Sequence, residues 1–376
     1  MNTIRSIGVV GLGTMGLGIA QVFAQAGCCV LATDAHAATL GSAASRLAAP
    51  LDKRVQAGKL AAEARDQTLS RFQCVPSLSA LAPAELVIEA IVEQLEAKRS
   101  LFRDLEAIVA PNAVLATNTS SLSVSSIAAA LAHPERLLGL HFFNPAPVMT
   151  LVELVAHAGT NQPSLDAARL ATEAAGKTVI ACADTPGFIV NRCARPFYGE
   201  ALALLEEGRS ASDIDAAMQA AGYLIGPFGL MDLIGADINL AATRSLNAAM
   251  AGGPRYHVFQ TLEAQVAKGE LGRKTGRGFL FPDRPQAAPV DAEAIVLRIE
   301  AALANEAASL LAEGRVSESN IDTALKLGLN FPRGPFESAR RHGLATLRRT
   351  LLDLDAKAPP HLKGRYAASP RLEAMA

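Results

Sequence analysis

The stretch GVVGLGTMGLGIA, residues 8–20, decides the fold. Its glycines follow GxGxxG spacing, directly after a short apolar run and at the start of a helical pattern. Glycine is needed here because the turn is tight, the backbone must approach a pyrophosphate, and the helix must pack close to the strand. The phosphates then meet exposed amides at the positive end of a helix. We therefore predict a dinucleotide-binding loop formed by Gly11, Gly13, Thr14, Met15 and Gly16.

An acidic residue supports this interpretation. Asp34 ends the next apolar run, CVLATD, and lies 23 residues after Gly11. A carboxylate at this point can bind the ribose hydroxyls of an adenosine, but it would repel a 2'-phosphate by an amount on the order of several kcal/mol. The sequence therefore favours NAD over NADP. The alternative is a glycine turn that only connects a strand to a helix.

Short apolar runs alternate with longer amphipathic segments from residue 7 to about residue 142. Two further runs, TLVELVA at 150–156 and TVIACAD at 178–184, add strands. This alternation predicts an α/β, Rossmann-like, doubly wound domain with a mostly parallel sheet. Pro50 falls inside the second long helical pattern, so we expect a break or kink there.

After residue 187 the strand signals nearly vanish, and the pattern predicts helices. Residues 200–228 recur as 306–336, sharing EA, LL, EGR, ID and GPF in order, which indicates a duplicated helical unit of roughly 100 residues. A proline-rich joint, FLFPDRPQAAPVDAE, separates the copies. We predict an NAD-binding domain over 1–186, followed by two all-α helical domains over 187–285 and 286–376.

Composition excludes several classes of function. A net charge of −1 provides no global basic field for nucleic acid or an anionic membrane. No apolar run has the length of a membrane span and no leader pattern opens the chain, so we expect a cytoplasmic protein. The five cysteines lack CxxC spacing, which argues against a disulfide framework and a zinc site. We expect reduced cysteines and no metal.

The stretch GLHFFNPAPVMTLVEL, residues 139–154, holds a candidate catalytic pair. His141 and Glu153 are centred on Pro147, so an antiparallel hairpin would place them opposite each other on one face. The carboxylate would then favour the protonated imidazole and determine which ring nitrogen faces a substrate, which suits a general base. The alternative is a structural His–Glu ion pair.

Further polar candidates follow a predicted parallel strand. ATNTSSLSV, residues 116–124, places Asn118, Ser120 and Ser121 at the carboxyl edge of the sheet, where doubly wound folds bind ligands. A hydroxyl there can hold a substrate oxygen. The alternative, which we favour for Ser121, is capping of a helix that begins near Ser123. Asn191 lies at the start of the first long helix of the helical part, where an amide could reach a substrate or lie on the surface.

Taken together, GLGTMGLGIAQ, VIEAIVE, TNTSSLS, HFFNPAPVMTLVE, DTPGFIVNR and LGRKTGRGF resemble the L-3-hydroxyacyl-CoA dehydrogenases. The resemblance covers residues 4 to about 281 and continues as a second helical copy to about residue 350. Within the family the chain is most similar to the bacterial 3-hydroxybutyryl-CoA and 3-hydroxyadipyl-CoA enzymes. This implies oxidation of a CoA thioester to its 3-oxoacyl form, with NAD as cofactor.

The resemblance also implies a role for individual residues. His141 matches the base, Glu153 the acid that orients it, Ser120 the hydroxyl that contacts the substrate oxygen and cofactor, and Asn191 the amide that holds the reacting carbonyl. Lys59 matches a lysine that meets CoA phosphates, although a lysine solvated at a helix end is the alternative. Beside the glycine loop and Asp34, the implied NAD-binding residues are Glu93, Lys98, Asn118, Asn144 and Lys274.

Three positions depart from the family pattern. Thr150 replaces a usual lysine and Gly229 a usual glutamate, while Leu297 in the second copy replaces the counterpart of Asn191. The second copy should therefore be structural. Single-copy relatives dimerise through the helical domain, so a second copy in the same chain predicts a monomer, with a homodimer as the alternative.

Two rival functions stay open at this point. One is a dehydrogenase acting on a free hydroxy acid or sugar acid, and the other is a catalytically silent nucleotide-binding structural protein. The basic tail from residue 331 is interpreted as a solvated helical face, with a role near CoA phosphates as the alternative.

Overall fold

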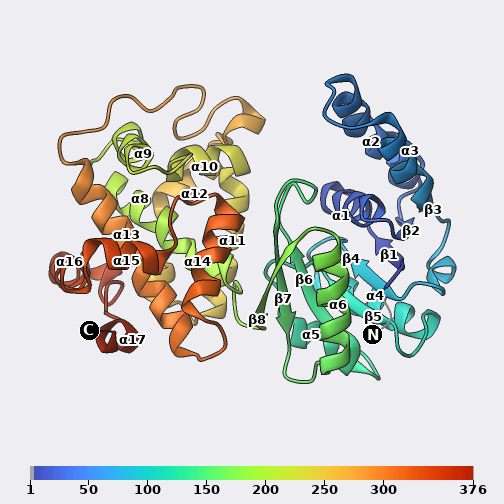
Figure 1. Cartoon of the computed structure of the whole chain (residues 1–376). Coiled ribbons are helices and arrows are strands. Elements are labelled where there is room, and N and C mark those ends of the chain that lie inside the picture. Colours follow the sequence, from blue (N-terminus) through green and yellow to red (C-terminus); the bar gives the residue numbers. More distant parts are fainter. Residues whose placement is uncertain (1–3, 376) are drawn as a thin grey trace. The chain divides into compact units, whose positions relative to one another are not determined.

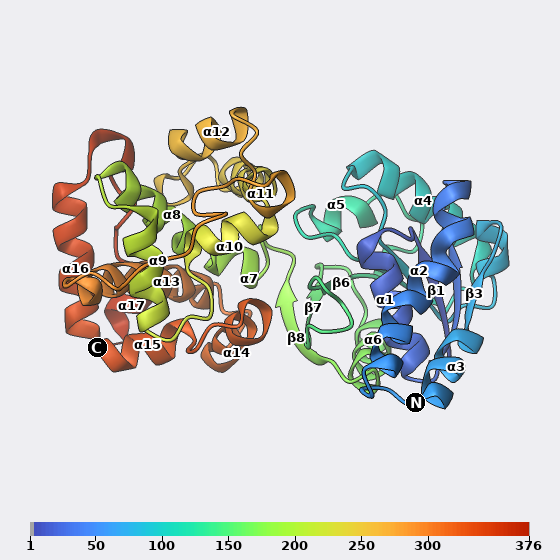
Figure 2. The ribbon, with the colours of Figure 1, turned by 90° about the horizontal axis from the view of Figure 1, so that it is seen from above.

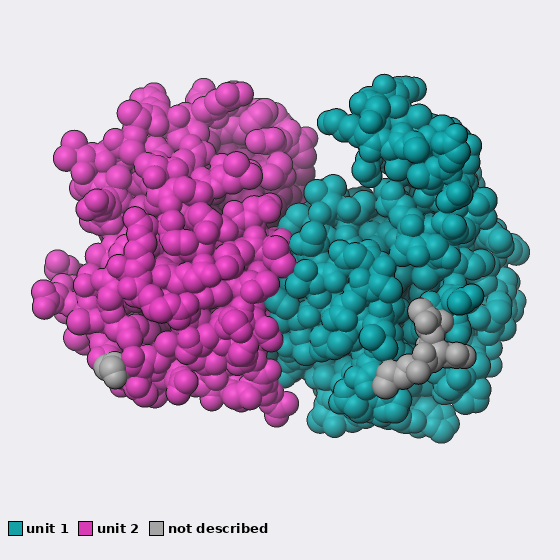
Figure 3. All heavy atoms as spheres, in the orientation of Figure 1, with its two compact units in different colours: residues 1–188 teal, residues 189–376 magenta. Residues whose placement is uncertain are grey.

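The chain folds as two compact units that divide after Phe188 (Figure 3). The computed structural model describes residues 4–375. The first unit contains a sheet with helices on both faces, and the second is built from helices (Figure 1).

The sheet of the first unit has eight strands in the order β3-β2-β1-β4-β5-β6-β7-β8. Every neighbouring pair is parallel except β6 and β7, so the predicted doubly wound, mostly parallel sheet is confirmed. The strands are β1 Ser6–Val10, β2 Cys29–Thr33, β3 Phe72–Cys74, β4 Leu86–Glu89, β5 Val114–Thr117, β6 Leu137–Phe142, β7 Leu151–Ala156 and β8 Thr178–Ala183. β3 escaped prediction because three residues are too few to carry a period.

Helices connect these strands. They are α1 Thr14–Gln25, α2 Ala37–Gln56, α3 Ala62–Arg71, α4 Leu95–Ile108, α5 Val124–Ala128 and α6 Gln162–Ala174, with 3-10 turns η1 Leu78–Leu81 and η2 Pro134–Arg136. α2 continues through Pro50, so the helix does not break there as the sequence suggested. Leu47 and Leu51 on either side are buried, and their packing offsets the backbone bond that proline removes.

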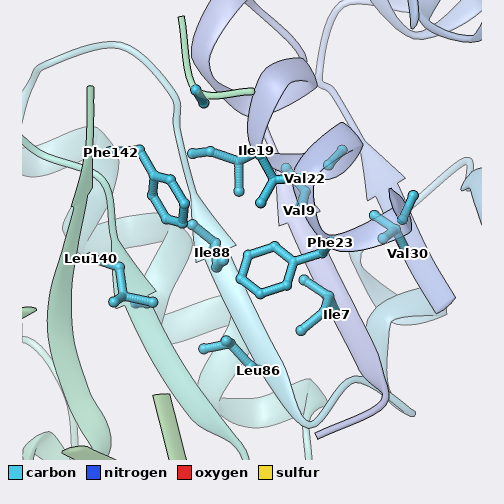
Figure 4. Close-up of a cluster of buried hydrophobic side chains, with 14 of the residues drawn as sticks. Ile7, Val9, Ile19, Val22, Phe23, Val30, Leu86, Ile88, Leu140 and Phe142 are labelled. Atoms are coloured by element: carbon cyan, nitrogen blue, oxygen red, sulfur yellow. The ribbon is translucent and has the colours of Figure 1, made fainter. Parts of the chain in front are cut away.

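The main core lies between the sheet and α1. Phe23 of α1 is fully buried among side chains of β1 and β4, and its ring meets that of Phe142 edge-on at 6.2 Å between centroids (Figure 4). Residues of α6 join the same cluster, whereas α4 and α5 lie on the other side of the sheet (Figure 2). Both faces are thus covered, and the carboxyl ends of β1, β4, β5 and β6 meet at one edge.

The second unit contains helices only, apart from an isolated bridge between Gly272 and Arg277. The first copy comprises α7 Val190–Cys193, α8 Arg195–Glu206, α9 Ala211–Ala220, α10 Pro227–Ile234, α11 Ala236–Ala249 and α12 Gln260–Ala267, with η3 Pro254–Tyr256 and η4 Arg273–Thr275. The second comprises α13 Ala292–Ala312, α14 Glu318–Leu329, α15 Pro335–His342, α16 Leu344–Lys357 and α17 Pro370–Ala374, with η5 Pro360–Leu362.

The repeated ID and GPF motifs have the same structural cause in both copies. Asp215 accepts hydrogen bonds from the amides of Phe228 (2.9 Å) and Gly229 (2.7 Å), which open α10. Asp322 accepts from the equivalent amides at the start of α15. A Cβ on Gly226 would lie 2.3 Å from the Asp215 side chain, and Gly334 is equally close to Asp322, so both caps require glycine.

Ion pairs of buried and partly buried arginines join the two copies with approximate two-fold symmetry. Arg192 of the first copy binds Glu306 and Glu313 of the second, while Arg298, its counterpart, binds Glu200 and Glu207 of the first. Arg255 pairs with Glu306 as Arg365 pairs with Glu200, and Tyr256 and Tyr366 donate to the same two glutamates. Each copy therefore supplies the partners for the other's buried charges.

Within residues 4–375, no helix is both long and apolar enough to cross a membrane. The same part of the chain holds no group of three or more His, Cys, Asp and Glu side chains arranged for a metal ion. All five cysteines are free thiols.

Candidate active site

The glycine loop joins β1 to α1 with a backbone that admits no larger residue at two positions. Gly11 has φ +92°, and a Cβ there would lie 2.6 Å from the carbonyl oxygen of Ala90. A Cβ on Gly16 would lie 1.7 Å from the oxygen of Gly11, so this residue permits the close helix packing. Beside Gly13 nothing lies within 4 Å of a hypothetical Cβ. This open side, next to the amides that start α1, leaves room for a phosphate.

Asp34 follows β2 and faces the glycine loop. Its Oδ2 accepts from the amide of Leu12 at 2.7 Å, and its Oδ1 accepts from the amide of His36 at 2.8 Å. Each carboxylate oxygen retains acceptor capacity that a ribose hydroxyl can use. Thr14 and Met15 form the first turn of α1. The residues expected to hold NAD on this side thus lie together, and their open geometry fits the cofactor.

The hairpin predicted from residues 139–154 is confirmed, because His141 and Glu153 are direct partners in the β6–β7 ladder. Nδ1 of the histidine lies 2.7 Å from Oε2 of the glutamate, and both side chains are buried. Leu140 and Phe142 belong to the core under α1, so the alternation of β6 turns His141 to the opposite face.

The His141 ring is confined by aromatic neighbours. Its centroid lies 4.5 Å from that of Phe143 and 5.8 Å from that of Phe188. Because the carboxylate accepts from Nδ1–H, the neutral ring carries its lone pair on Nε2, which is the atom that can take a proton. A buried imidazole with one nitrogen fixed is suited to be a base.

Glu93 holds the loop that carries Ser120. Its Oε1 accepts from the Thr119 hydroxyl at 2.6 Å, the Ser120 amide at 3.1 Å and the Ser121 hydroxyl at 2.9 Å. Burial alone would raise the pKa of Glu93, but the Lys98 ammonium and these hydroxyls outweigh burial and lower it. The ionised carboxylate therefore fixes the Ser120 loop.

A buried ion pair holds Glu93 in place, and we call Glu93 with its hydrogen bonds to the Ser120 loop the Glu93 clamp. Lys98 is 1% exposed, and its Nζ lies 2.5 Å from Oε1 of Glu89 and 3.2 Å from Oε2 of Glu93. Glu89 also accepts from the hydroxyl of Thr117 at 2.7 Å. Glu89 was not among the predicted site residues, although a glutamate at the end of the apolar run LVIE was a visible signal. Lys98 thus reaches the Ser120 loop through Glu93.

Asn118 connects the ends of two strands. Its Oδ1 accepts from the amide of Phe142 at 2.8 Å, which ties the carboxyl end of β5 to β6. The Ser120 loop and His141 therefore occupy the same part of the sheet edge, as parallel pairing of β5 and β6 requires.

Asp184, at the end of β8, is a residue that sequence reasoning missed. It accepts from the amides of Val124 (2.8 Å) and Ser125 (2.7 Å) and from the hydroxyl of Ser123 (2.9 Å). Ser123 is the side-chain cap of α5, so the preferred reading of Ser121 as the cap was wrong. The N-cap of α5 lies two residues after Ser121, and the Ser121 hydroxyl donates to Glu93 instead.

Lys177 is a second missed residue. Its buried ammonium donates to the carbonyl oxygens of Ala146 (2.6 Å) and Met149 (2.8 Å), and burial lowers its pKa. It thereby fixes the turn of the β6–β7 hairpin, in which Asn144 and Thr150 are exposed. A lysine beyond the hairpin in sequence gave no signal of this contact.

Two of the remaining predicted residues belong to the second unit, and one lies elsewhere in the first. Asn191 belongs to α7 in the second unit, where its carbonyl oxygen accepts from Nε of Arg195 at 3.0 Å. Lys274 is also in the second unit and pairs with Asp237 at 2.6 Å. Lys59 is exposed just beyond the end of α2 in the first unit.

The glycine turn after β1, the acid after β2 and the carboxylate-held imidazole on β6 define a Rossmann-type, NAD-binding dehydrogenase. The family profile described as "3-hydroxyacyl-CoA dehydrogenase, NAD binding domain" matches residues 6–185. The profile described as "3-hydroxyacyl-CoA dehydrogenase, C-terminal domain" matches twice, over 187–281 and 295–376. The chain therefore belongs to the 3-hydroxyacyl-CoA dehydrogenase family, oxidoreductases that act on CH–OH donors with NAD.

Individual relatives agree with the family. The chain is 45% identical over 280 residues to a 3-hydroxyadipyl-CoA dehydrogenase of Escherichia coli K12, covering 74% of this chain but only 59% of that relative. It is 40% identical to a 3-hydroxybutyryl-CoA dehydrogenase of Bradyrhizobium diazoefficiens, covering 73% of this chain and 94% of the relative.

Among solved structures, a 3-hydroxybutyryl-CoA dehydrogenase from Escherichia coli K12 superposes with a TM-score of 0.91 at 33% identity, over 100% of this chain and 98% of that one. The resemblance stated from the motifs is confirmed, as is the fold of an NAD-binding α/β domain followed by two helical copies.

Proposed function

We propose that His141 is the general base in the oxidation of an L-3-hydroxyacyl-CoA to the 3-oxoacyl-CoA, with Glu153 orienting it. The observation that carries this proposal is the 2.7 Å contact between Nδ1 of His141 and the buried carboxylate. That contact leaves Nε2 to take the proton of the 3-hydroxyl group, and the developing imidazolium gains from the adjacent negative charge.

Other residues bind and orient in this scheme. NAD, when bound, supplies the hydride acceptor, and Gly11, Gly13, Gly16 and Asp34 would hold it. The Ser120 hydroxyl would donate to the substrate oxygen that His141 deprotonates. Asn191 would donate to the reacting carbonyl. Support comes from the Glu93 clamp, which gives the Ser120 loop a defined position.

The other cofactor and substrate contacts follow the family pattern. We assign Asn118, Asn144 and Lys274 to NAD directly, and Glu93 and Lys98 to the cofactor side of the Ser120 loop. Lys59 is assigned to CoA phosphate, which fits its exposed ammonium.

The reaction is tested with a His141→Gln variant, in acetoacetyl-CoA reduction followed through NADH absorbance. We expect a loss of turnover of about 100- to 10,000-fold, with NADH affinity retained, because the ring transfers a proton and the glycine loop binds the dinucleotide. His157→Gln is the matched control, since His157 lies in the same unit and its ring contacts backbone atoms, the oxygen of Pro134 through Nε2 and the amide of Gly159 through Nδ1. Turnover near wild type in the His141 variant would remove the proposed base.

The same assay separates the rival functions. A dehydrogenase of free hydroxy or sugar acids would oxidise those acids and leave acetoacetyl-CoA unchanged, whereas a silent structural relative would turn over neither. The family membership and the intact His141–Glu153 pair favour the CoA thioester. A panel of CoA thioesters that differ in length and terminal charge then measures the acyl preference.

We propose a monomer with the three domains expected from the sequence and a cytoplasmic location. The ion pairs between the two helical copies support the monomer. The surface that a helical domain would use to bind a second chain is here covered by the other copy of the same chain. Five free thiols fit a reducing compartment. Light scattering on a sizing column should give a mass near 39.2 kDa, and twice that mass would show a homodimer.

A further inference from the structure

The second unit contains a buried arginine without an acidic partner. Arg195, at the start of α8, is 8% exposed. Its guanidinium donates to neutral acceptors, namely the carbonyl oxygen of Asn191 at 3.0 Å, the hydroxyl of Thr243 at 3.2 Å and the carbonyl oxygen of Asn239 at 3.5 Å. It lies over the ring of Tyr198 at 4.8 Å. Among residues 4–375, the charged group has no carboxylate within ion-pair distance.

The neighbouring ion pairs cannot compensate this charge, because they are already balanced. Four arginines and four glutamates form the network between the two copies, namely Arg192, Arg255, Arg298, Arg365, Glu200, Glu207, Glu306 and Glu313. Arg195 is a fifth arginine in this region, so one buried positive charge is left over. A guanidinium stays protonated when buried, and an uncompensated buried charge is costly.

Arg195 lines a cavity. The cavity has an empty volume of about 290 Å³, which includes a part open to solvent, and its lining includes Tyr198, Thr243, His257 and Arg365. Its enclosed part holds roughly one water-sized particle. Burial and the charges of His361 and Arg365 lower the pKa of His257, while Glu206 and Glu263 act in the opposite direction with smaller effect. The lining thus combines the Arg195 guanidinium, which has no acidic partner, with Arg365, which pairs with Glu200.

The second helical copy shows that the fold does not need this arginine. The positions equivalent to Arg195 and Thr243 are Ala301 and Leu351, and both are buried apolar residues. The equivalent helices of the second copy thus pack with an apolar residue at each of these two positions. If Arg195 served only to bind backbone carbonyls, a neutral donor would do so without burying a charge.

We propose that this cavity binds one small inorganic anion, of the size and charge of chloride, against the Arg195 guanidinium. The single uncompensated positive charge calls for a monovalent ion, and the enclosed space excludes an ion much larger than water. The site belongs to the first copy alone, because the second copy has replaced both polar residues.

Thermal unfolding in potassium chloride and in potassium gluconate, at constant ionic strength, tests the proposal. A bound anion stabilises the folded chain by mass action, so chloride should raise the melting temperature by about 2–4 °C and saturate. The matched variant is Arg195→Ala with Thr243→Leu, which copies the pair found in the second copy and should fold. Its melting temperature should not respond to the exchange of salts.

Equal chloride responses in wild type and variant would show a general salt effect and overturn the proposal, as would no response in the wild type. Crystals grown in sodium bromide give an independent readout. We expect an anomalous peak within about 3.5 Å of the guanidinium of Arg195 in the wild type and no such peak in the variant. Wild-type crystals without that peak would refute the site. Neither readout involves dehydrogenase turnover, so the outcome does not depend on the proposed function.

Discussion

Replacing Glu153 with glutamine removes a buried negative charge while keeping the shape of the side chain. In the wild type the carboxylate lies 2.7 Å from Nδ1 of His141, and Glu153 is fully buried. Its charge matters most when the ring takes the substrate proton and becomes positive. The variant therefore loses an interaction that grows in the transition state.

The size of the loss follows from the geometry. For charge centres roughly 4 Å apart and an effective dielectric constant of about 20, the attraction is about 4 kcal/mol. The charge is only partly developed in the transition state, so we expect to lose about 2–4 kcal/mol, which corresponds to a fall in kcat of about 30- to 1,000-fold. KM should change little, since the carboxylate stabilises the charge that develops on the ring in the transition state and not the bound substrate.

The assay is NADH-dependent reduction of acetoacetyl-CoA, with NADH affinity and melting temperature measured on the same samples. Retained NADH affinity shows that the glycine loop and Asp34 are intact. A kcat within threefold of wild type would refute the role of Glu153, and a rise in KM at unchanged kcat would assign it to substrate binding instead.

Three further perturbations test other parts of the site. Asp34→Asn should weaken NADH binding and narrow the preference for NADH over NADPH, and an unchanged preference in titrations with both would contradict the ribose assignment. The folded-state pKa of Glu93 is lowered, so its ionised form adds stability above about pH 4.5 that is lost as the pH falls. In urea unfolding, the difference in unfolding free energy between wild type and Glu93→Gln should therefore narrow below that pH. A difference that stays constant with pH would contradict the hydrogen bonds assigned to the Glu93 carboxylate. Asp184→Asn should lower the free energy of unfolding by about 1–2 kcal/mol and should lower kcat more than NADH affinity. The control is Asp104→Asn, an exposed position, which should change neither quantity. If both variants lost the same stability and kcat, the contact between Asp184 and α5 would have no special role.

Local patterns predicted the elements whose physics is local. The GxGxxG spacing, the alternating strands and the glycine-flanked helices each need only neighbouring residues to be recognised. The His141–Glu153 pairing was also predictable, because a hairpin centred on Pro147 sets its own register. The three-residue strand β3 and the continuation of α2 through Pro50 were not, since each depends on burial against other segments.

The same distinction applies to the polar groups. Glu93 was predicted from the family pattern, but its hydrogen bonds to the Ser120 loop, 27 residues away, emerged only in the structure. Lys177 and Asp184 carry no motif of their own, because their partners are backbone atoms of distant loops. A side chain that binds backbone groups leaves no complementary residue type to be recognised in a sequence.

By itself the sequence determined the class of fold, the dinucleotide loop, the histidine–glutamate hairpin and the duplication of the helical part, because spacing along the chain encodes turn geometry, register and repeat. Only the tertiary structure decided which groups clamp the Ser120 loop and how the two copies share their buried charges. It also decided that Arg195 is left without an acid. Whether a buried charge is compensated depends on the distances in space to all other charges, and those charges can come from residues far apart in the chain.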